Sequence, residues 1–153
     1  MTTQAPGEHE HRIVVGVDGS DPSKAALAWA IRQGALTGAT VEAVIAWELP
    51  VNYGTPAPLM PPRTDLEEVA REVIALAVAD VSSPDQQVTI RCKVVEGNAP
   101  RVLLDASAEA DLLVVGSRGH GGFVEALLGS VGQHCVHHAT CPVVVIRDSV
   151  TSG

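Results

Sequence analysis

Aromatic side chains, positive charge and long apolar runs are all scarce in this chain of 153 residues. Only two Trp, one Tyr and one Phe are present, so the core must be built from Ala, Val, Leu and Ile. Ten basic residues stand against 18 acidic ones for a net charge of -8, whereas a nucleic-acid surface needs a basic patch. No apolar run approaches the ~18 residues of a membrane span. Neither nucleic acid nor a membrane is therefore expected as a partner.

Cysteine is rare as well, with Cys92, Cys135 and Cys141 as the three examples. An odd number of thiols in a chain without an export signal favours reduced cysteines and a cytoplasmic location. The first residues are polar and lack the basic start and apolar stretch of a signal peptide. The length suits one domain, and 46% apolar residues are enough for a substantial core.

Short apolar strands alternate with longer amphipathic helices along the whole chain. We expect strands at residues 13–17, 41–47, 88–94, 111–115 and 143–146, and helices at 21–37, 64–81, 100–108 and from 130 onward. This alternation predicts an α/β fold, a single doubly wound domain whose parallel sheet has helices on both faces. We expect residues 1–10 to be a disordered tail, residues 11–148 to be the domain and residues 149–153 to be a frayed end.

Local signals mark the ends of several helices. Asp21, followed by a proline, is predicted to cap the first helix, and Gly38 to end it. Thr64 and Glu67 fit a capping box at the start of the second helix. The segment 49–63 holds half of the chain's ten prolines, so it can be neither helix nor central strand. A loop this long inside a compact domain is usually functional or mobile.

The stretch after the predicted strand at 111–115 is rich in glycine. The strand breaks at Gly116, further glycines stand at positions 119, 121, 122 and 129, and Ser130 opens a helix and fits a capping box with Gln133. Glycine lets the backbone approach a ligand closely, and the N–H groups of a helix N-terminus attract anions. The stretch is neither a P-loop nor the dinucleotide fingerprint. It predicts a phosphate cradle, with an ordinary glycine-rich surface loop as the alternative.

Three motifs, in their order and spacing, resemble the universal stress proteins. They are I-V-V-G-V-D-G-S at 13–20, A-D-L-L-V-V-G-S-R-G at 110–119 and C-P-V-V-V-I at 141–146. Within them, Gly116, Gly119 and the pair Gly129-Ser130 match the G-2x-G-9x-G-S/T signature of the ATP-binding members. The resemblance covers residues 11 to 148. It implies a five-stranded sheet in the order 3-2-1-4-5, with the reversal of strand order between strands one and four.

Ligands of open α/β sheets bind at the carboxyl ends of the strands where the order reverses. The resemblance implies that adenine is contacted by Gly16, Val17 and Ala46, and that ribose and phosphates are held by Gly116, Gly119, Gly129, Ser130 and Val131. Arg118 and His120 are candidates for screening phosphate charge, with solvated side chains as the alternative. Asp18 can accept hydrogen bonds from ribose hydroxyls or the adenine amine. Its alternative role is that of a turn residue that bonds its own backbone.

The function expected from this resemblance is ATP binding by a stress-response or signalling module, with Mg²⁺ arriving on the nucleotide. No general base is evident near the phosphates, so no enzyme activity is expected, although slow ATP hydrolysis stays open. One alternative is another adenine nucleotide such as cyclic AMP, and a second is a slow ATPase or nucleotide hydrolase. A third is a dimerisation module without nucleotide, which the intact glycine signature disfavours.

Histidine and cysteine crowd one short segment, which holds His134, Cys135, His137, His138 and Cys141. Both residue types are zinc ligands, and on a helix His134 shares a face with His137 and His138. No second C-x-x-C or H-x-x-x-H pair is present to complete four ligands, so we expect no metal site. No serine lies in G-x-S-x-G, so no serine nucleophile is expected either.

The last predicted strand is apolar throughout, with Val143, Val144, Val145 and Ile146, and the first charge follows at Arg147. In the implied order it lies at a sheet edge, where unpaired backbone groups and apolar side chains invite another chain. Universal stress proteins commonly dimerise through this strand. We therefore expect a homodimer built on residues 143–146.

Overall fold

The computed structural model describes residues 10–49, 63–117 and 128–147. The predictions for the two ends of the chain and for the proline-rich segment fall almost entirely outside these ranges, as do those for Arg118, Gly119 and His120. Within the predicted N-terminal tail Glu10 is described, and its carboxylate accepts a hydrogen bond from the Arg91 guanidinium at 3.1 Å.

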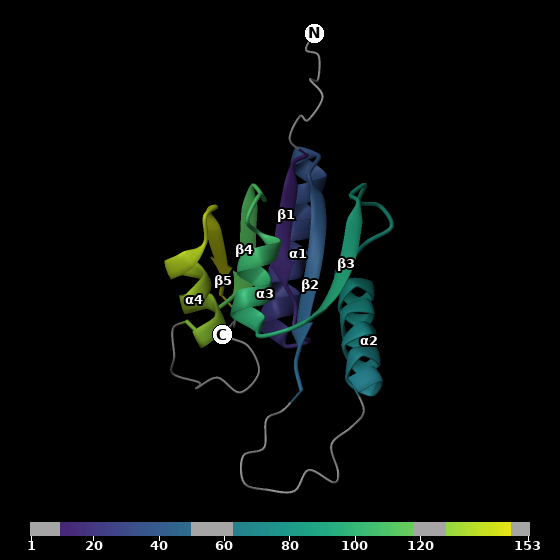
Figure 1. Cartoon of the computed structure of the whole chain (residues 1–153). Helices are drawn as coiled ribbons and strands as arrows, with labels where there is room; N and C mark the ends of the chain where they lie inside the picture. The colour runs from purple at the N-terminus through teal and green to yellow at the C-terminus, as the bar shows by residue number, and fades with distance from the viewer. Residues whose placement is uncertain (1–9, 50–62, 118–127, 148–153) are drawn as a thin grey trace, which may run out of the picture.

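The described residues form one sheet of five parallel strands (Figure 1). The strands are β1 (Arg12–Gly16), β2 (Thr40–Trp47), β3 (Ile90–Glu96), β4 (Leu112–Gly116) and β5 (Val143–Ile146). Their order across the sheet is β3-β2-β1-β4-β5, as predicted. All five predicted strands are present, with ends shifted by at most two residues. The doubly wound α/β fold is therefore confirmed.

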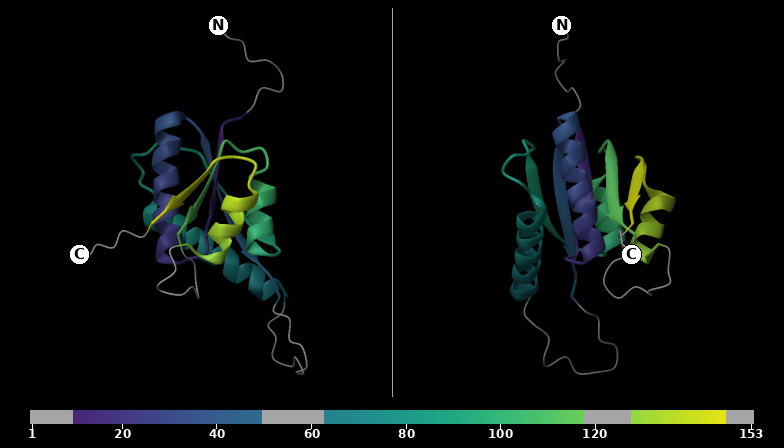
Figure 2. Two further views of the ribbon diagram at one scale, coloured as in Figure 1. Left: turned by 90° about the vertical axis from the view of Figure 1, so that its left-hand side faces the viewer. Right: turned by 180° about the vertical axis from the view of Figure 1, so that it is seen from behind.

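Helices cover both faces of this sheet. α1 (Asp21–Thr37) and α2 (Arg63–Val81) pack on one face, and α3 (Ala99–Ala106) and α4 (Ser130–His138) on the other. Figure 1 looks onto α3 and α4, and the right-hand panel of Figure 2 shows α1 and α2 in front. All the strands run in one direction, so α1 and α4 both begin at their carboxyl ends, the lower end in Figure 1. None of the described helices is long and apolar enough to span a membrane.

Val, Leu, Ile and Ala make up almost the whole buried core, as the shortage of aromatic residues predicts. One cluster lies between the sheet and the first two helices and includes Leu27 and Ile74. A second lies beneath α3 and α4 and includes Leu113 and Cys135. Full burial of a single Leu or Ile side chain contributes roughly 1.5–3 kcal/mol, so these two clusters account for the stability of the layered arrangement.

The start of α1 differs from its prediction by one residue. Ser20, rather than Asp21, is the N-cap, and its Oγ accepts a hydrogen bond from the Ser23 N–H at 3.3 Å. Both residue types are good caps, and the turn before the helix places the serine oxygen over the first N–H groups. The predicted end is confirmed: Gly38 has a φ of 80° and its N–H donates to the carbonyl of Gly34.

α2 also begins one residue earlier than predicted. Its first residue is Arg63, so Thr64 lies inside the first turn rather than at the N-cap position. The described contact of Glu67 is with the following turn of the helix. Its carboxylate accepts a hydrogen bond from Arg71, one turn further along, at 2.6 Å. The capping box predicted for this helix is therefore wrong.

One carboxylate lies in the interior of the sheet. Glu42 on β2 is 2% exposed, and its two carboxylate oxygens lie 2.8 Å from Arg12 Nη1 and 3.2 Å from Lys93 Nζ. Arg12 Nη1 also donates to the carbonyl of Ala106 at 3.1 Å. Burying a charge is costly unless it is paired, and this network pairs it. Sequence reasoning missed the network because its three charges come from three strands that meet only in the folded sheet.

Candidate functional site

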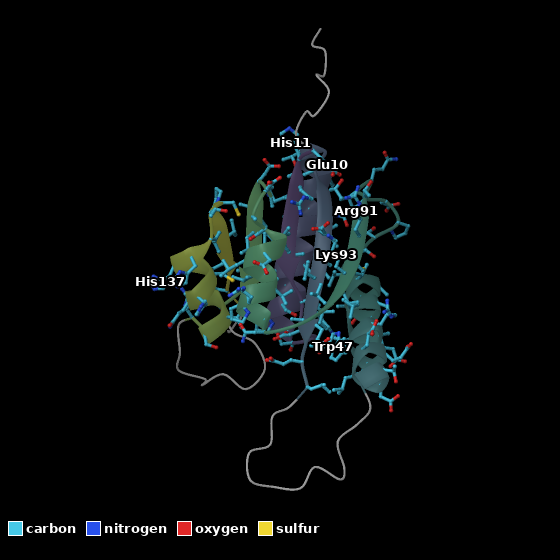
Figure 3. The ribbon with its side chains drawn as sticks, viewed as in Figure 1. Glu10, His11, Trp47, Arg91, Lys93 and His137 are labelled. Carbon is cyan, nitrogen blue, oxygen red and sulfur yellow. The ribbon has the colours of Figure 1, made fainter. Side chains whose placement is uncertain are left out.

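The carboxyl ends of β1 and β4 lie side by side at the centre of the sheet. β1 pairs with β2 on one side and with β4 on the other, so the strand order reverses between β1 and β4. The chain after β1 leads to α1 on one face, and α4, which follows β4, lies on the other face. Trp47, at the end of β2, marks this end of the sheet in Figure 3. Open α/β sheets bind ligands at such a point.

A tight turn joins β1 to α1. The Asp18 carboxylate accepts hydrogen bonds from the Ser20 N–H, at 2.9 Å, and from the Ser20 hydroxyl. The Ser23 hydroxyl accepts from the Asp18 N–H at 3.2 Å and donates to the Ser20 carbonyl at 3.1 Å. Gly19 has a φ of 85°, which favours glycine. Asp18 therefore has the turn role that was its alternative, and its contact with a ribose stays a prediction.

Gly116, the last residue of β4, is pressed against the first turn of α1. A Cβ atom built on Gly116 would lie 2.8 Å from both the carbonyl carbon and the carbonyl oxygen of Pro22. Backbone atoms cannot move aside as a flexible side chain can, so glycine is needed here for close approach. This contact places the second sequence motif against the helix that directly follows the first motif.

The first turn of α4 reaches the same glycine from the other side. Gly132 is buried, and a Cβ atom built on it would lie 2.6 Å from Leu128 Cδ1 and 3.7 Å from the Gly116 carbonyl oxygen. Two helix N-termini therefore converge on Gly116, one from each face of the sheet. The positive ends of both helix dipoles lie near this point. In α1 Pro22 has no N–H and the Ser23 N–H is bound by the Ser20 cap, so the N–H groups for a ligand would come from the first turn of α4. Such an arrangement attracts an anion.

Backbone hydrogen bonds fix both ends of the glycine-rich segment. The Ser117 N–H donates to the Ile146 carbonyl at 2.9 Å, and the Gly129 N–H donates to the Ser117 carbonyl at 2.6 Å. The Gly129 N–H is thus already engaged, so a phosphate would need the N–H groups that follow it in α4. Sequence reasoning missed Ser117, which is 5% exposed. Its only sequence signal is its place directly after the last glycine of the strand.

α4 begins without the predicted capping box. Its N-cap is Gly129, with φ -72° and ψ 171°, and no side-chain cap bond forms there among the described residues. Gln133 Nε2 donates instead to the Leu128 carbonyl at 3.2 Å. Ser130, the predicted cap, is exposed and is already the first helical residue. The first turn of this helix has no side-chain cap at Gly129, which keeps it open to an anion.

The residues implied to contact adenine lie at the ends of β1 and β2. Gly16 and Ala46 are half-buried, and a Cβ on Gly16 would lie 2.7 Å from Leu103 Cδ1, so α3 covers this glycine. Val17 is different, because its side chain is buried in the core beneath α1 and α2. Its N–H donates to the Val44 carbonyl at 2.9 Å. Val17 can therefore offer a ligand its carbonyl oxygen but not its N–H.

Burial disfavours ionisation of all three thiols. Burial raises the pKa of the Cys135 thiol to about 11, with the neighbouring Cys141 as a second cause. Burial also raises the pKa of Cys141 and of Cys92. All three are free cysteines and stay protonated at neutral pH, and only a thiolate is a nucleophile. The described residues contain no group of three or more His, Cys, Asp or Glu that could hold a metal ion.

A cavity of about 300 Å³ lies at the opposite end of the sheet from these motifs. It is lined by Gly34, Gly38, Ala39, Gln87, Val88 and Thr89. None of these side chains carries a charge, and none belongs to the residues that the sequence analysis assigned to a ligand. The cavity therefore does not compete with the central crevice as the candidate site.

These features define a doubly wound α/β protein with a candidate anion site where its strand order reverses. The sequence model of the universal stress protein family matches residues 10–147. The chain belongs to the universal stress protein family, as its three motifs predict.

Relatives and solved structures agree with this assignment. A universal stress protein of Mycolicibacterium smegmatis is 40% identical over 145 residues, covering 90% of this chain and 48% of that protein. The chain thus spans about half the length of the curated relatives it matches. Universal stress protein UspA from Lactobacillus plantarum superposes with a TM-score of 0.68 at 27% identity, over 91% of this chain and 99% of that one. A universal stress protein in complex with cAMP has a TM-score of 0.63 at 26% identity, over 92% and 99% of the two chains.

Proposed function

We propose that this chain binds ATP with Mg²⁺ and works as a nucleotide-dependent module of a stress response. The observation that carries the proposal is the convergence of the α1 and α4 N-termini on Gly116. A triphosphate is an anion that such a point would hold. Mg²⁺ usually binds through substrate phosphates and few protein carboxylates, so the absence of a three-ligand group among the described residues is compatible with it.

The proposed contacts follow the geometry from one end of the nucleotide to the other. Gly16, Ala46 and the Val17 carbonyl would line the base, and Asp18 would meet the ribose. The first turn of α4, at Ser130 and Val131, would hold the phosphates by its N–H groups. Arg118, Gly119 and His120 belong to the same proposal by their place in the glycine signature, and they lie outside the described residues.

Cyclic AMP is the second candidate ligand. The observation in its favour is the likeness to the family member whose structure contains cAMP. It carries one phosphate where ATP carries three, so it would use less of the segment between Gly116 and Gly129. Competition between ATP and cyclic AMP for the purified protein would rank the two ligands directly.

The proposed role is that of a binding protein rather than an enzyme. Hydrolysis needs a group that takes a proton from water, and neither the turn-bound Asp18 nor the protonated thiols provide one. A slow ATPase or nucleotide hydrolase is the alternative. A steady-state turnover above roughly 1 s⁻¹, the low end of ordinary enzymes, would overturn the binding-only role.

Calorimetric titration with ATP and Mg²⁺ tests the site. We expect a dissociation constant in about the micromolar range, or ~-8 kcal/mol. Gly129→Val should abolish binding, because a branched side chain would stand in front of the first turn of α4. The Gly129 φ of -72° suits valine, so the fold should survive. Val136→Ala is the matched control, since Val136 is 48% exposed on the same helix. Equal ATP affinity in Gly129→Val and the control would contradict the phosphate site.

The homodimer and the location complete the proposal. Residues Val143–Ile146 form an edge strand in the described sheet, which supports pairing with a second copy through β5. All three cysteines are free thiols in the structure, which supports a cytoplasmic location because cytosolic proteins rarely carry disulfides.

A further inference from the structure

The exposed face of α4 carries histidines that the proposed nucleotide site does not use. His134, His137 and His138 are all exposed, and Figure 3 shows His137 pointing away from the sheet. The ring centroids of His134 and His138 are 4.9 Å apart, with the ring planes tilted by 41°. The His137 centroid is 6.4 Å from that of His138. The structure thus separates a close pair of imidazoles from a third histidine on the same turn.

Residues four apart on a helix are neighbours on one face, and two histidines at this spacing can bind one metal ion between them. Imidazole suits zinc, copper and nickel, whereas Mg²⁺ and Ca²⁺ prefer oxygen ligands. α4 has the sequence S-V-G-Q-H-C-V-H-H and carries no acidic residue. Any metal at the pair would therefore be selected by nitrogen ligands, and would differ from the Mg²⁺ that accompanies a nucleotide.

The cysteine in this segment does not contribute. Cys135 is fully buried, with its side chain in the core beneath α3 and α4, whereas the two imidazoles lie in solvent. Because no group of three or more suitable side chains is present among the described residues, water would complete the coordination. The sequence analysis excluded a metal because it required four protein ligands, a requirement that holds for a closed structural site only.

We propose that His134 and His138 form a two-histidine site on the outer face of α4 for an exchangeable divalent transition metal. The affinity should follow the general order for nitrogen ligands, with Cu²⁺ above both Ni²⁺ and Zn²⁺. Mg²⁺ should not compete.

Titration of the full chain with Ni²⁺ is the primary test, since Ni²⁺ does not oxidise thiols. The measurement uses a His9→Gln, His11→Gln, Cys92→Ser background, which removes the N-terminal histidines and the exposed thiol. We expect one Ni²⁺ per chain. His134→Gln and His138→Gln should each weaken binding by about 100-fold, because joining two ligands in one molecule raises affinity by 10²–10⁴. His137→Gln is the matched control and should leave the affinity unchanged.

Two results would overturn the proposal. One is Ni²⁺ affinity that persists in His134→Gln and His138→Gln, which would place the metal elsewhere. The other is an equal loss in His137→Gln, which would remove the distinction between the pair and the third histidine. An electron paramagnetic resonance spectrum of the Cu²⁺-loaded protein, without mutations in α4, provides a test that does not depend on the folding of any α4 variant. Coupling to two imidazole nitrogens is expected, and coupling to none or one would contradict the site.

Discussion

The two edges of the sheet differ sharply in chemistry. β3, at one edge, carries Arg91 and Lys93 with half-exposed side chains, and it ends at the exposed Glu96. β5, at the other edge, consists of three valines and one isoleucine, all half-buried. An open edge strand is normally protected from pairing by charge. β3 follows this rule and β5 does not, and this difference supports β5 rather than β3 as the edge of the proposed dimer.

The packing of β5 supports this interpretation. Val143 and Val145 pack against the core beneath α3 and α4, whereas Val144 and Ile146 pack against the core beneath α1 and α2. The strand is therefore held from both faces of the sheet. Its inner edge is paired with β4, and its outer edge is not paired with any described strand. At the other edge, by contrast, ion pairs to Glu10 and Glu42 engage the charges of β3.

The largest effect is expected from substitutions in β5. Val144→Lys combined with Val145→Lys should turn the proposed dimer into a monomer, because a two-fold axis would bring like charges together. A shift of the dissociation constant from micromolar to beyond millimolar corresponds to at least ~4 kcal/mol. Light scattering, with a single chain at 15.9 kDa, measures the change.

The matched control lies on the other edge. Arg91→Ala combined with Lys93→Ala should leave the mass of the assembly unchanged, since β3 takes no part in the proposed pairing. A wild-type mass near that of one chain at micromolar concentration would rule the dimer out. A dimer that resists the β5 lysines but is lost in the β3 variant would reverse the roles of the two edges.

The second largest effect concerns Glu42, the buried carboxylate of β2 that pairs with Lys93 of β3. Glu42→Ala should lower the free energy of unfolding by about 3 kcal/mol, because it leaves the largely buried Arg12 guanidinium without its carboxylate. Urea unfolding followed by circular dichroism measures the loss. The exposed pair of Arg91 with Glu10 is the reference, and Arg91→Ala should change stability by less than ~1 kcal/mol. Equal losses in the two variants would show that burial of Glu42 has no energetic consequence.

The apolar character of β5 could be predicted from the sequence, whereas the ion pairs beside β3 could not. The apolar run of β5 can be read directly, because four successive apolar residues leave no polar face. The Glu42 network could not be predicted, since its three charges come from three strands and meet only when β1, β2 and β3 pair. The same limit applies at the site. The strands were predicted with ends within two residues of those observed. The cap of α4 at Gly129 could not be predicted because the Gly129 N–H bonds to Ser117, twelve residues earlier, and Ser20 and Asp21 are equally good caps by residue type.

Alkaline pH should destabilise the core beside β5, which contains Cys135, more than it destabilises the β3 edge. The pKa of Cys135 is raised from its ordinary value of 9.0 to about 11. The folded state therefore holds its proton more tightly than the unfolded state. The resulting stability is fully present below pH 9 and is lost as the pH rises from 9 towards 11, by up to about 2 kcal/mol.

Urea unfolding at several pH values between 8 and 11 measures this loss. Cys135→Ala should flatten most of the profile, because the fully buried thiol is then gone and the remaining Cys141 and Cys92 are more exposed. Cys92→Ala is the control on β3: burial raises the pKa of that thiol too, but Cys92 is exposed and its contribution should be smaller. A profile that flattens in the Cys92 variant and not in the Cys135 variant would contradict the assignment.

The smallest effect on stability is expected from removing the charge of Lys93 on β3. Lys93 Nζ lies 3.2 Å from a Glu42 oxygen, but the lysine side chain is 51% exposed. Water can therefore solvate the ammonium group in the folded protein, and in Lys93→Met the Glu42 carboxylate keeps its closer partner, Arg12, at 2.8 Å. A partly exposed ion pair contributes ~0–1 kcal/mol, so the variant should lose less than that in urea unfolding. A loss as large as that of Glu42→Ala would mean that both cations are needed to hold the buried carboxylate. In that case Lys93 would stabilise the buried Glu42 carboxylate in addition to disfavouring the pairing of β3 with another strand.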